Sequence, residues 1–162
     1  MSISDHIVLM KNGVLQQYDK PQALYAEPAN QFVADFLGNP PINNLRGVAR
    51  DGMFVLEDGS ASCALPKIAA KIPNGRKVNL AIRAEAVLTP DEPVMSPVQM
   101  NCRVKSMYAM GKEELGFLQF GSQEFRAYIS ADSSLRTGSE GMFSLKNRGV
   151  YVFDAETGAR YE

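Results

Sequence analysis

From residue 43 to residue 153 the chain repeats one pattern: a short run of alternating hydrophobic and polar residues, followed by a glycine-rich turn. Such runs predict β-strands, and the intervening glycines and asparagines predict tight turns. The expected strands are residues 43–49, 53–56, 61–65, 77–82, 98–109, 114–120, 124–129, 141–145 and 149–153. Many short strands at this spacing favour a closed or nearly closed β-barrel, because closure removes exposed strand edges.

Residues 1–40 carry a different pattern. Two short hydrophobic runs flank Asn12-Gly13, a pair that tolerates the positive φ of a tight hairpin turn. Pro21 fits the first turn of a short helix, and Asn30 can cap a second one. Two consecutive prolines then predict a boundary. We therefore expect a hairpin and two helices in residues 1–40, and a mostly β, OB-like barrel in residues 41–162.

The expected second helix has a hydrophobic stripe. Phe32, Val33, Phe36 and Leu37 recur along it at helical spacing. An apolar stripe of this size either packs back on the barrel or marks an interface with a partner. These four residues are therefore the interface candidates.

The composition excludes several classes of protein. Lys and Arg, 17 in all, nearly balance the 18 Asp and Glu residues, and there is no Trp, so no nucleic-acid partner is expected. No hydrophobic run approaches the ~20 residues that span a bilayer as a helix. Two cysteines and one histidine cannot supply the about four ligands of a zinc site, so no metal site is expected.

The chain also has no recognisable catalytic constellation. Neither of the Gly-rich phosphate-binding motifs of nucleotide enzymes occurs. The only histidine, His6, precedes a hydrophobic run near the start of the chain and suits a surface position. The acidic pairs Asp91-Glu92 and Glu113-Glu114 suit turns and strand ends better than acid–base chemistry. We therefore expect no catalytic or cofactor-binding residue and no enzyme activity in this chain.

Three residues stand out as regulatory or structural candidates. Arg83 and Glu85 follow the expected strand 77–82, and residues two apart on an extended chain point the same way. They are expected to form a local ion pair or anchor a loop, with binding of an anionic or polyol ligand as the alternative. Gly111 interrupts a long extended stretch, which predicts a bulge or a sharp bend at a barrel corner.

A longer pattern runs through the first 43 residues. It consists of Asp5, Ile7, Val8, Met10, Gly13, Gln17, Pro21, Leu24, Tyr25, Pro28, Ala29, Asn30, Phe32, Val33, Ala34, Phe36, Leu37, Gly38, Pro40, Ile42 and Asn43. With these residues at these spacings, the segment resembles the end of the nucleotide-binding domain in the ATP-binding subunits of ABC importers. The similarity is to the maltose and glycerol-3-phosphate type.

The rest of the chain resembles the C-terminal regulatory region of the same subunits, called the TOBE or MOP-like domain. The segments that carry this similarity are residues 80–87, 107–113 and 152–158, with Ala84 in place of the family's proline. The fold implied is an OB-like barrel.

The resemblance implies that the chain is a fragment. In this family the phosphate loop, the signature motif, the catalytic acid and the switch histidine all precede the position of Asp5. ATP and Mg would therefore belong to the full-length subunit, and no cofactor to this chain. The resemblance further implies a homodimer formed through the regulatory domain, transmembrane permease subunits, and a regulatory protein or small molecule as partners. The full complex would lie on the cytoplasmic face of the cell membrane and import sugars or related solutes.

Two alternatives stay open from the sequence. The first is a stand-alone small-ligand module, because related MOP-like barrels bind oxyanions. The second is a stand-alone enzyme, which the missing nucleophile, metal cluster and phosphate loop disfavour.

Overall fold

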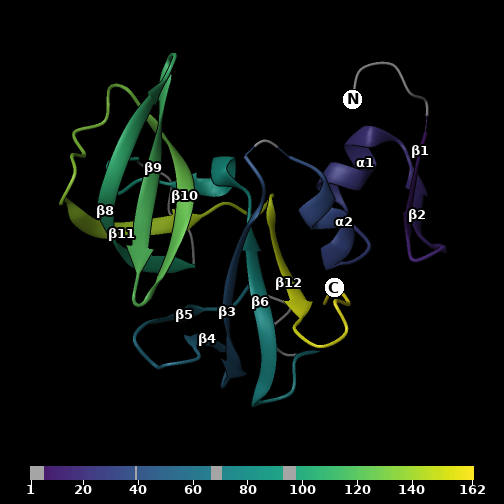
Figure 1. Ribbon diagram of the computed structural model, residues 1–162. Coiled ribbons are helices and arrows are strands. Elements are labelled where there is room, and N and C mark those ends of the chain that lie inside the picture. Colours follow the sequence, from purple (N-terminus) through teal and green to yellow (C-terminus); the bar gives the residue numbers. More distant parts are fainter. Residues whose placement is uncertain (1–5, 39, 67–70, 93–97) are drawn as a thin grey trace.

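The computed structural model describes residues 6–38, 40–66, 71–92 and 98–162 (Figure 1). The pattern residue Asp5 lies outside these ranges. Within them the chain is mostly β, as the sequence predicts, with two short helices and a hairpin at one end. Every strand expected from residue 43 onward is present, and each begins and ends within one residue of its expected bounds.

The N-terminal part is the predicted hairpin followed by two helices. Its elements are β1 (Ile7–Lys11), β2 (Val14–Asp19), α1 (Pro21–Ala26) and α2 (Gln31–Phe36). Asn12 and Gly13 form the hairpin turn with φ of 52° and 79°. The side chain of Asn30 accepts a hydrogen bond from the backbone N–H of Val33 (3.1 Å) and so caps α2.

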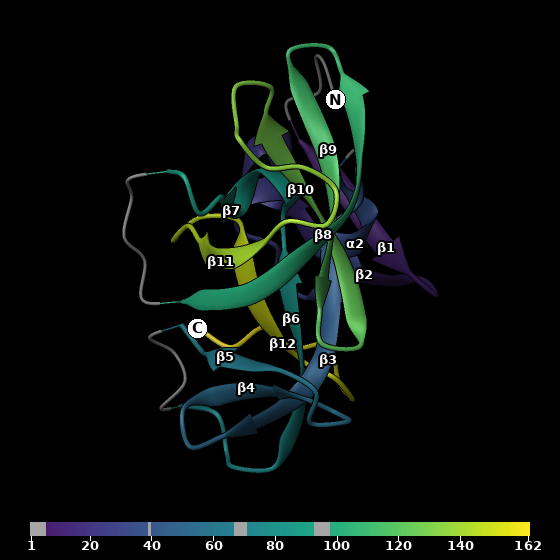
Figure 2. The same ribbon diagram turned by 90° about the vertical axis from the view of Figure 1, so that its left-hand side faces the viewer.

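Two five-stranded antiparallel sheets make up the rest of the described chain (Figure 1, Figure 2). The first has the order β12-β6-β3-β4-β5, with β3 (Asn43–Arg50), β4 (Met53–Leu56), β5 (Ser62–Ala64), β6 (Arg76–Ile82) and β12 (Val150–Asp154). The second has the order β10-β9-β8-β11-β7, with β7 (Val87–Leu88), β8 (Gln99–Met110), β9 (Glu113–Phe120), β10 (Gln123–Ser130) and β11 (Glu140–Leu145).

One hydrophobic core fills the space between the two sheets. Leu45, Phe54 and Leu80 reach it from the first sheet, and Leu118 and Phe143 from the second. All five side chains are fully buried. The alternation along each strand places these residues on the inner face and leaves polar residues outside, which is the arrangement of a curled, OB-like barrel.

Strands β3 and β10 meet at the seam between the sheets, where two side-chain amides replace backbone pairing. Asn43 on β3 accepts a hydrogen bond from Arg126 N (2.9 Å) and donates to Arg126 O (2.8 Å). Gln123 on β10 makes the corresponding pair of bonds to β3. Its side chain accepts a hydrogen bond from Arg46 N (2.9 Å) and donates one to Arg46 O (2.7 Å). Each amide satisfies both polar groups of one backbone residue and thereby links the sheets.

Two features differ from the sequence-based expectation. A 3-10 turn (Ala84–Ala86) and the two-residue strand β7 follow Arg83, and neither is long enough to show a periodic pattern. Gly111 lies in the tight β8–β9 turn with φ 74°, so it makes a sharp bend but no bulge. The register shift of that hairpin lies between Val104 and Ser106 instead.

The helices pack on the first sheet through a second small cluster. Ala34 of α2 is buried there with Ile42, Ala81, Tyr151 and Phe153. Figure 1 shows α2 beside β12, with the hairpin farther out. The boundary predicted between residues 40 and 41 is thus bridged by a shared core, and the division into two domains stays a prediction.

The hydrophobic stripe of α2 is divided between two environments. Val33 and Leu37 are buried with Leu9 of the hairpin and Leu24 of α1. Phe32 packs, partly buried, against the same cluster, whereas Phe36 is 61% exposed. Three of the four interface candidates thus contact the hairpin and α1, and Phe36 is the one that is mostly exposed; their role in a partner interface stays a prediction.

Candidate functional site at the junction of helices and sheet

Arg83 ties the ends of both helices to the barrel. It follows β6, and only 1% of its surface is exposed. Its Nη1 donates to Leu37 O (2.6 Å) and Ala34 O (3.3 Å), and its Nη2 donates to Tyr25 O (3.1 Å). Carbonyl groups at a helix C-terminus lack intrahelical partners and carry partial negative charge. The guanidinium supplies both the missing donors and the compensating charge.

Tyr25 lies between Arg83 and Glu85. The guanidinium carbon of Arg83 stands 4.0 Å from the centroid of the tyrosine ring. The Tyr25 hydroxyl donates a hydrogen bond to Glu85 Oε1. Burial, followed by this bond and the negative charge of Glu85, raises the pKa of Tyr25 to about 12, so the phenol stays protonated. No ion pair joins Arg83 and Glu85 in the described part of the chain. The anchoring role expected for Arg83 thus fits the structure, and the direct ion pair is wrong.

Two glycines leave room for the Arg83 side chain. A Cβ at Gly38 would lie 3.0 Å from Arg83 Nη1, and a Cβ at Gly149 would lie 3.3 Å from Arg83 Cβ. Both residues also have positive φ, 120° and 82°. A side chain at either position would therefore meet Arg83 and strain the backbone at once.

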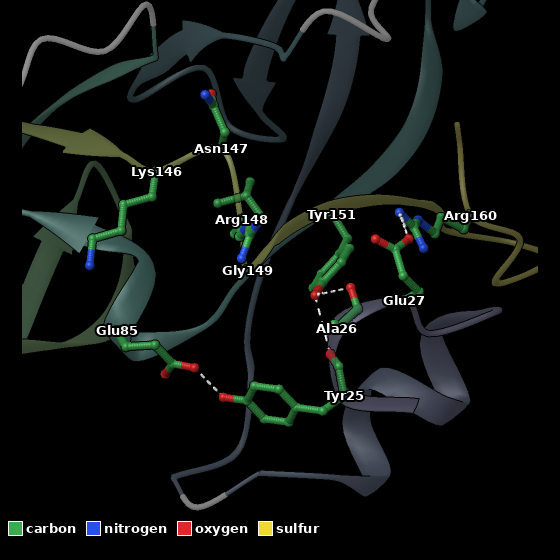
Figure 3. A pocket seen from close by; sticks show the side chains of 11 residues that line it. Tyr25, Ala26, Glu27, Glu85, Lys146, Asn147, Arg148, Gly149, Tyr151 and Arg160 are labelled. Carbon is green, nitrogen blue, oxygen red and sulfur yellow. Dashed lines mark hydrogen bonds and ion pairs between the residues drawn. The ribbon is translucent and has the colours of Figure 1, made fainter. Parts of the chain in front are cut away.

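A cleft of about 550 Å³ opens beside this anchor. Figure 3 shows Tyr25 and Glu85 on one side of it and Tyr151 and Arg160 on another. The loop 146–149 between β11 and β12 forms the remaining wall. The cleft therefore lies where α1, the 3-10 turn, β12 and the C-terminal residues come together, and interfaces between structural units are common places for ligand sites.

Tyr151 and Arg160 fasten the C-terminal end of α1 to the first sheet from the other side of the cleft. The Tyr151 hydroxyl is 2.8 Å from Ala26 O and 3.2 Å from Tyr25 O. Burial raises the pKa of Tyr151, which keeps this donor protonated. Arg160 forms an ion pair with Glu27 (2.8 Å), and its guanidinium lies 5.2 Å from the Tyr151 ring centroid.

Two cations of the cleft have no partner of opposite charge among the residues that the structure describes. Lys146 and Arg148 are exposed and form no ion pair or side-chain hydrogen bond with any residue in the described ranges. The loop that carries them is nevertheless fixed by its backbone. Lys146 N donates to Ala86 O (2.8 Å), and Gly149 O accepts from Arg83 N (2.8 Å). Their backbone positions are thus set by the same turn that holds Arg83.

The other chemistry-bearing residues lie apart from this cleft. Within the described ranges no three His, Cys, Asp or Glu residues come together as metal ligands. Cys63 and Cys102 are buried in the main core, and burial raises the pKa of each thiol to about 12, so both act as neutral hydrophobic residues. The His6 ring stacks on Tyr18 with their centroids 4.9 Å apart.

Sequence reasoning found only part of this site. The spacing of Arg83 and Glu85 predicts a role for both, and Tyr25 belongs to the long N-terminal pattern. Nothing in the sequence marks Lys146 or Arg148, because the residues across the cleft from them, Tyr25 and Glu85, are more than 60 positions away along the chain. Among the described residues, no helix is long and apolar enough to cross a membrane.

No protein-family model matches the chain. Its fold is similar to that of a solved structure, the cytoplasmic molybdate-binding protein ModG, with a TM-score of 0.52 and 15% identity over 68% of this chain and 94% of that one. Likeness at this identity concerns the fold alone, and it agrees with the OB-like barrel.

Curated relatives match along the whole chain. It is 33% identical to an sn-glycerol-3-phosphate import ATP-binding protein of Chromohalobacter salexigens, covering 99% of this chain and 42% of the relative. It is 29% identical to an oligosaccharides import ATP-binding protein of Bacillus subtilis (99% and 45%), and 30% identical to a putative ABC transporter ATP-binding protein of Mycoplasma pneumoniae (100% and 26%). The chain spans less than half the length of these relatives. It is homologous to the C-terminal part of the ATP-binding proteins of ABC importers.

Proposed function

We propose that the chain is the regulatory and dimerisation module of an ABC-importer ATP-binding subunit, joined to the last hairpin and helices of its ATP-binding domain. The observation that carries this proposal is the anchoring of both helix ends by Arg83. A buried guanidinium bound to three carbonyl oxygens makes a stiff connection. Any protein or small molecule that prefers one arrangement of the barrel would then bias the ATP-binding domain through it.

The exposed hydrophobic residues of the N-terminal part support this assignment. Val8, Met10, Val14 and Leu15 of the hairpin are each more than half exposed, as is Phe36 of α2. Exposed apolar groups gathered on one small segment mark an interface. We assign this surface to the part of the ATP-binding domain that the chain does not include.

In the intact subunit, ATP and Mg would bind upstream of this chain, and the partners would be a second ATP-binding subunit and transmembrane permease subunits. The complex would sit on the cytoplasmic face of the membrane and import sugars or related solutes, as the names of the relatives suggest. We expect no ATP turnover by this chain above a no-protein control. Turnover that survives repurification would contradict its role as a non-enzymatic module.

Self-association tests the dimerisation part directly. We expect sedimentation equilibrium to show the 17.8 kDa chain moving toward twice that mass as its concentration rises. Because Phe36 belongs to the surface assigned to the ATP-binding domain, Phe36→Asp should leave a dimer formed through the barrel intact. A strictly monomeric chain up to ~0.5 mM would contradict dimerisation through this module.

A further inference from the structure

The cleft beside Arg83 is lined in part by charged side chains that do not help to hold the helix ends on the barrel. Arg83, Tyr151 and Arg160 are all engaged with helix-end carbonyl groups or with Glu27. Lys146 and Arg148 contribute nothing to that anchoring, since neither is paired within the described ranges. Two positive charges that take no part in the anchoring therefore border a cleft of about 550 Å³.

The opposite wall offers hydrogen-bond acceptors. Glu85 accepts the Tyr25 hydroxyl through Oε1, which leaves Oε2 and further lone pairs of the carboxylate for another donor. Figure 3 shows the Lys146 side chain extending from its loop toward the side where Glu85 lies, with Arg148 between Lys146 and Tyr151. A cationic edge and an acceptor thus border the same space.

From this arrangement we infer that the cleft binds a small hydroxylated organic anion. Lys146 and Arg148 would hold its phosphoryl or carboxylate oxygens, and Glu85 would accept hydrogen bonds from its hydroxyl groups. Arg is suited to two parallel hydrogen bonds to such an oxyanion, whereas Lys acts as a point charge. The volume suits a ligand of monosaccharide size.

A ligand bound in the cleft would change the contacts through which Arg83 holds the helix ends. Glu85 accepts a hydrogen bond from the Tyr25 hydroxyl, and the Arg83 guanidinium packs on the face of the Tyr25 ring. A ligand that draws Glu85 toward its own hydroxyls changes the support of that ring. As an effector site the cleft rests on the proposed regulatory function, whereas binding itself does not.

Isothermal titration calorimetry on the 162-residue chain tests the inference. The probes are D-glucose 6-phosphate, D-gluconate, D-glucose and inorganic phosphate, each up to about 10 mM. We expect at least one hydroxylated anion to bind more tightly than both glucose and inorganic phosphate. Comparison of glucose 6-phosphate with gluconate decides whether the anionic group is phosphoryl or carboxylate. No binding of either, or equal binding of inorganic phosphate, would overturn the inference.

Variants locate the binding. Lys146→Ala and Arg148→Ala should each weaken it about tenfold, because each removes one charge-assisted contact. Both side chains are exposed and form no ion pair with a described residue, so folding should be unaffected. Lys112→Ala in the exposed β8–β9 turn is the matched control. Glu85→Gln should lower the preference for the hydroxylated anion over inorganic phosphate. Binding that is unchanged in the Lys146 and Arg148 variants would overturn this site.

The test of ligand binding is independent of the test of the proposed dimerisation. Sedimentation equilibrium reports self-association without ligand, whereas calorimetry reports binding to the chain in any oligomeric state. Binding without dimerisation would keep the site and contradict the module. Dimerisation without binding would keep the module and contradict the site.

Discussion

The Arg83 guanidinium covers the Tyr25 ring at 4.0 Å and at the same time binds the carbonyl oxygen of Tyr25 at 3.1 Å. One side chain thus contacts both the face of an aromatic residue and its backbone at the end of α1. The same guanidinium reaches α2 through Leu37 O. Arg83 is therefore the residue that links both helix ends to the barrel at once, beside the contacts that Tyr151 makes with α1 and Ala34 of α2 makes with the first sheet.

Replacing Arg83 should destabilise the chain strongly. Arg83→Ala would remove the side-chain donor from Leu37 O and Ala34 O and leave Tyr25 O with the Tyr151 hydroxyl alone, at a cost of about 3 kcal/mol in the free energy of unfolding. Arg83→Lys keeps the charge but cannot serve both helices with a planar fork, so we expect it to recover less than half of the loss. Urea titration followed by circular dichroism gives both values. Lys112→Ala should match the unchanged chain, and an Arg83→Ala variant within 0.5 kcal/mol of it would contradict the anchoring role.

The seam between the two sheets gives a second prediction. Asn43→Asp would turn a donor toward Ile82 O and Arg126 O into a carboxylate oxygen facing two carbonyl oxygens. Asn43 is only 4% exposed, so we expect a loss of about 3 kcal/mol in the free energy of unfolding. Gln123→Glu makes the same change at a partly exposed site and should cost about 1 kcal/mol.

Chemical denaturation of both variants at pH 7 tests this order. Equal losses in the free energy of unfolding for Asn43→Asp and Gln123→Glu would show that burial does not determine the cost of these substitutions. A loss at Gln123 larger than that at Asn43 would contradict the arrangement in which Asn43 is the inner of the two links.

Acid should weaken the C-terminal turn through Asp154. Its carboxylate accepts hydrogen bonds from Arg76 Nε, the Tyr161 hydroxyl, and the backbone N–H groups of Glu156 and Thr157. The bond from Arg76 is the main cause that lowers the pKa of Asp154 well below its usual value of about 4. In acid the unfolded state therefore takes up a proton before the folded state does. This contribution to stability is present above about pH 4 and is lost as the pH falls from there toward the lowered pKa.

The measurement is the free energy of unfolding between pH 7 and pH 3 for the unchanged chain and for Asp154→Asn. The variant should be less stable at pH 7 and should lose less stability on acidification. Asp132→Asn, at an exposed loop position, is the control that should follow the unchanged chain. Parallel pH curves for the chain and Asp154→Asn would contradict the role given to this carboxylate.

The parts of the fold that the sequence predicted depend on neighbouring residues. Asn12 and Gly13 set their turn by their own φ preferences, and Asn30 caps α2 three residues away. Arg83 and the seam residues Asn43 and Gln123 depend instead on the partners Leu37, Tyr25, Arg126 and Arg46, which are 46 to 83 positions away and which local patterns do not encode. The charge of Arg83 pointed to a special role, but its partners are backbone carbonyls, which every residue has. The sequence therefore suggested an Arg83–Glu85 ion pair where the structure places Tyr25 between them.

The divided stripe of α2 gives the last prediction. Phe36 is 61% exposed, so Phe36→Asp should change the free energy of unfolding by less than about 0.5 kcal/mol while it raises solubility. Val33 is fully buried against Leu24, so Val33→Asp places an unpaired carboxylate in an apolar cluster and should unfold the helical part. Light scattering at rising concentration and thermal melts separate the two effects. Similar melting temperatures for the two variants would contradict the division, because they would place both side chains in the same environment.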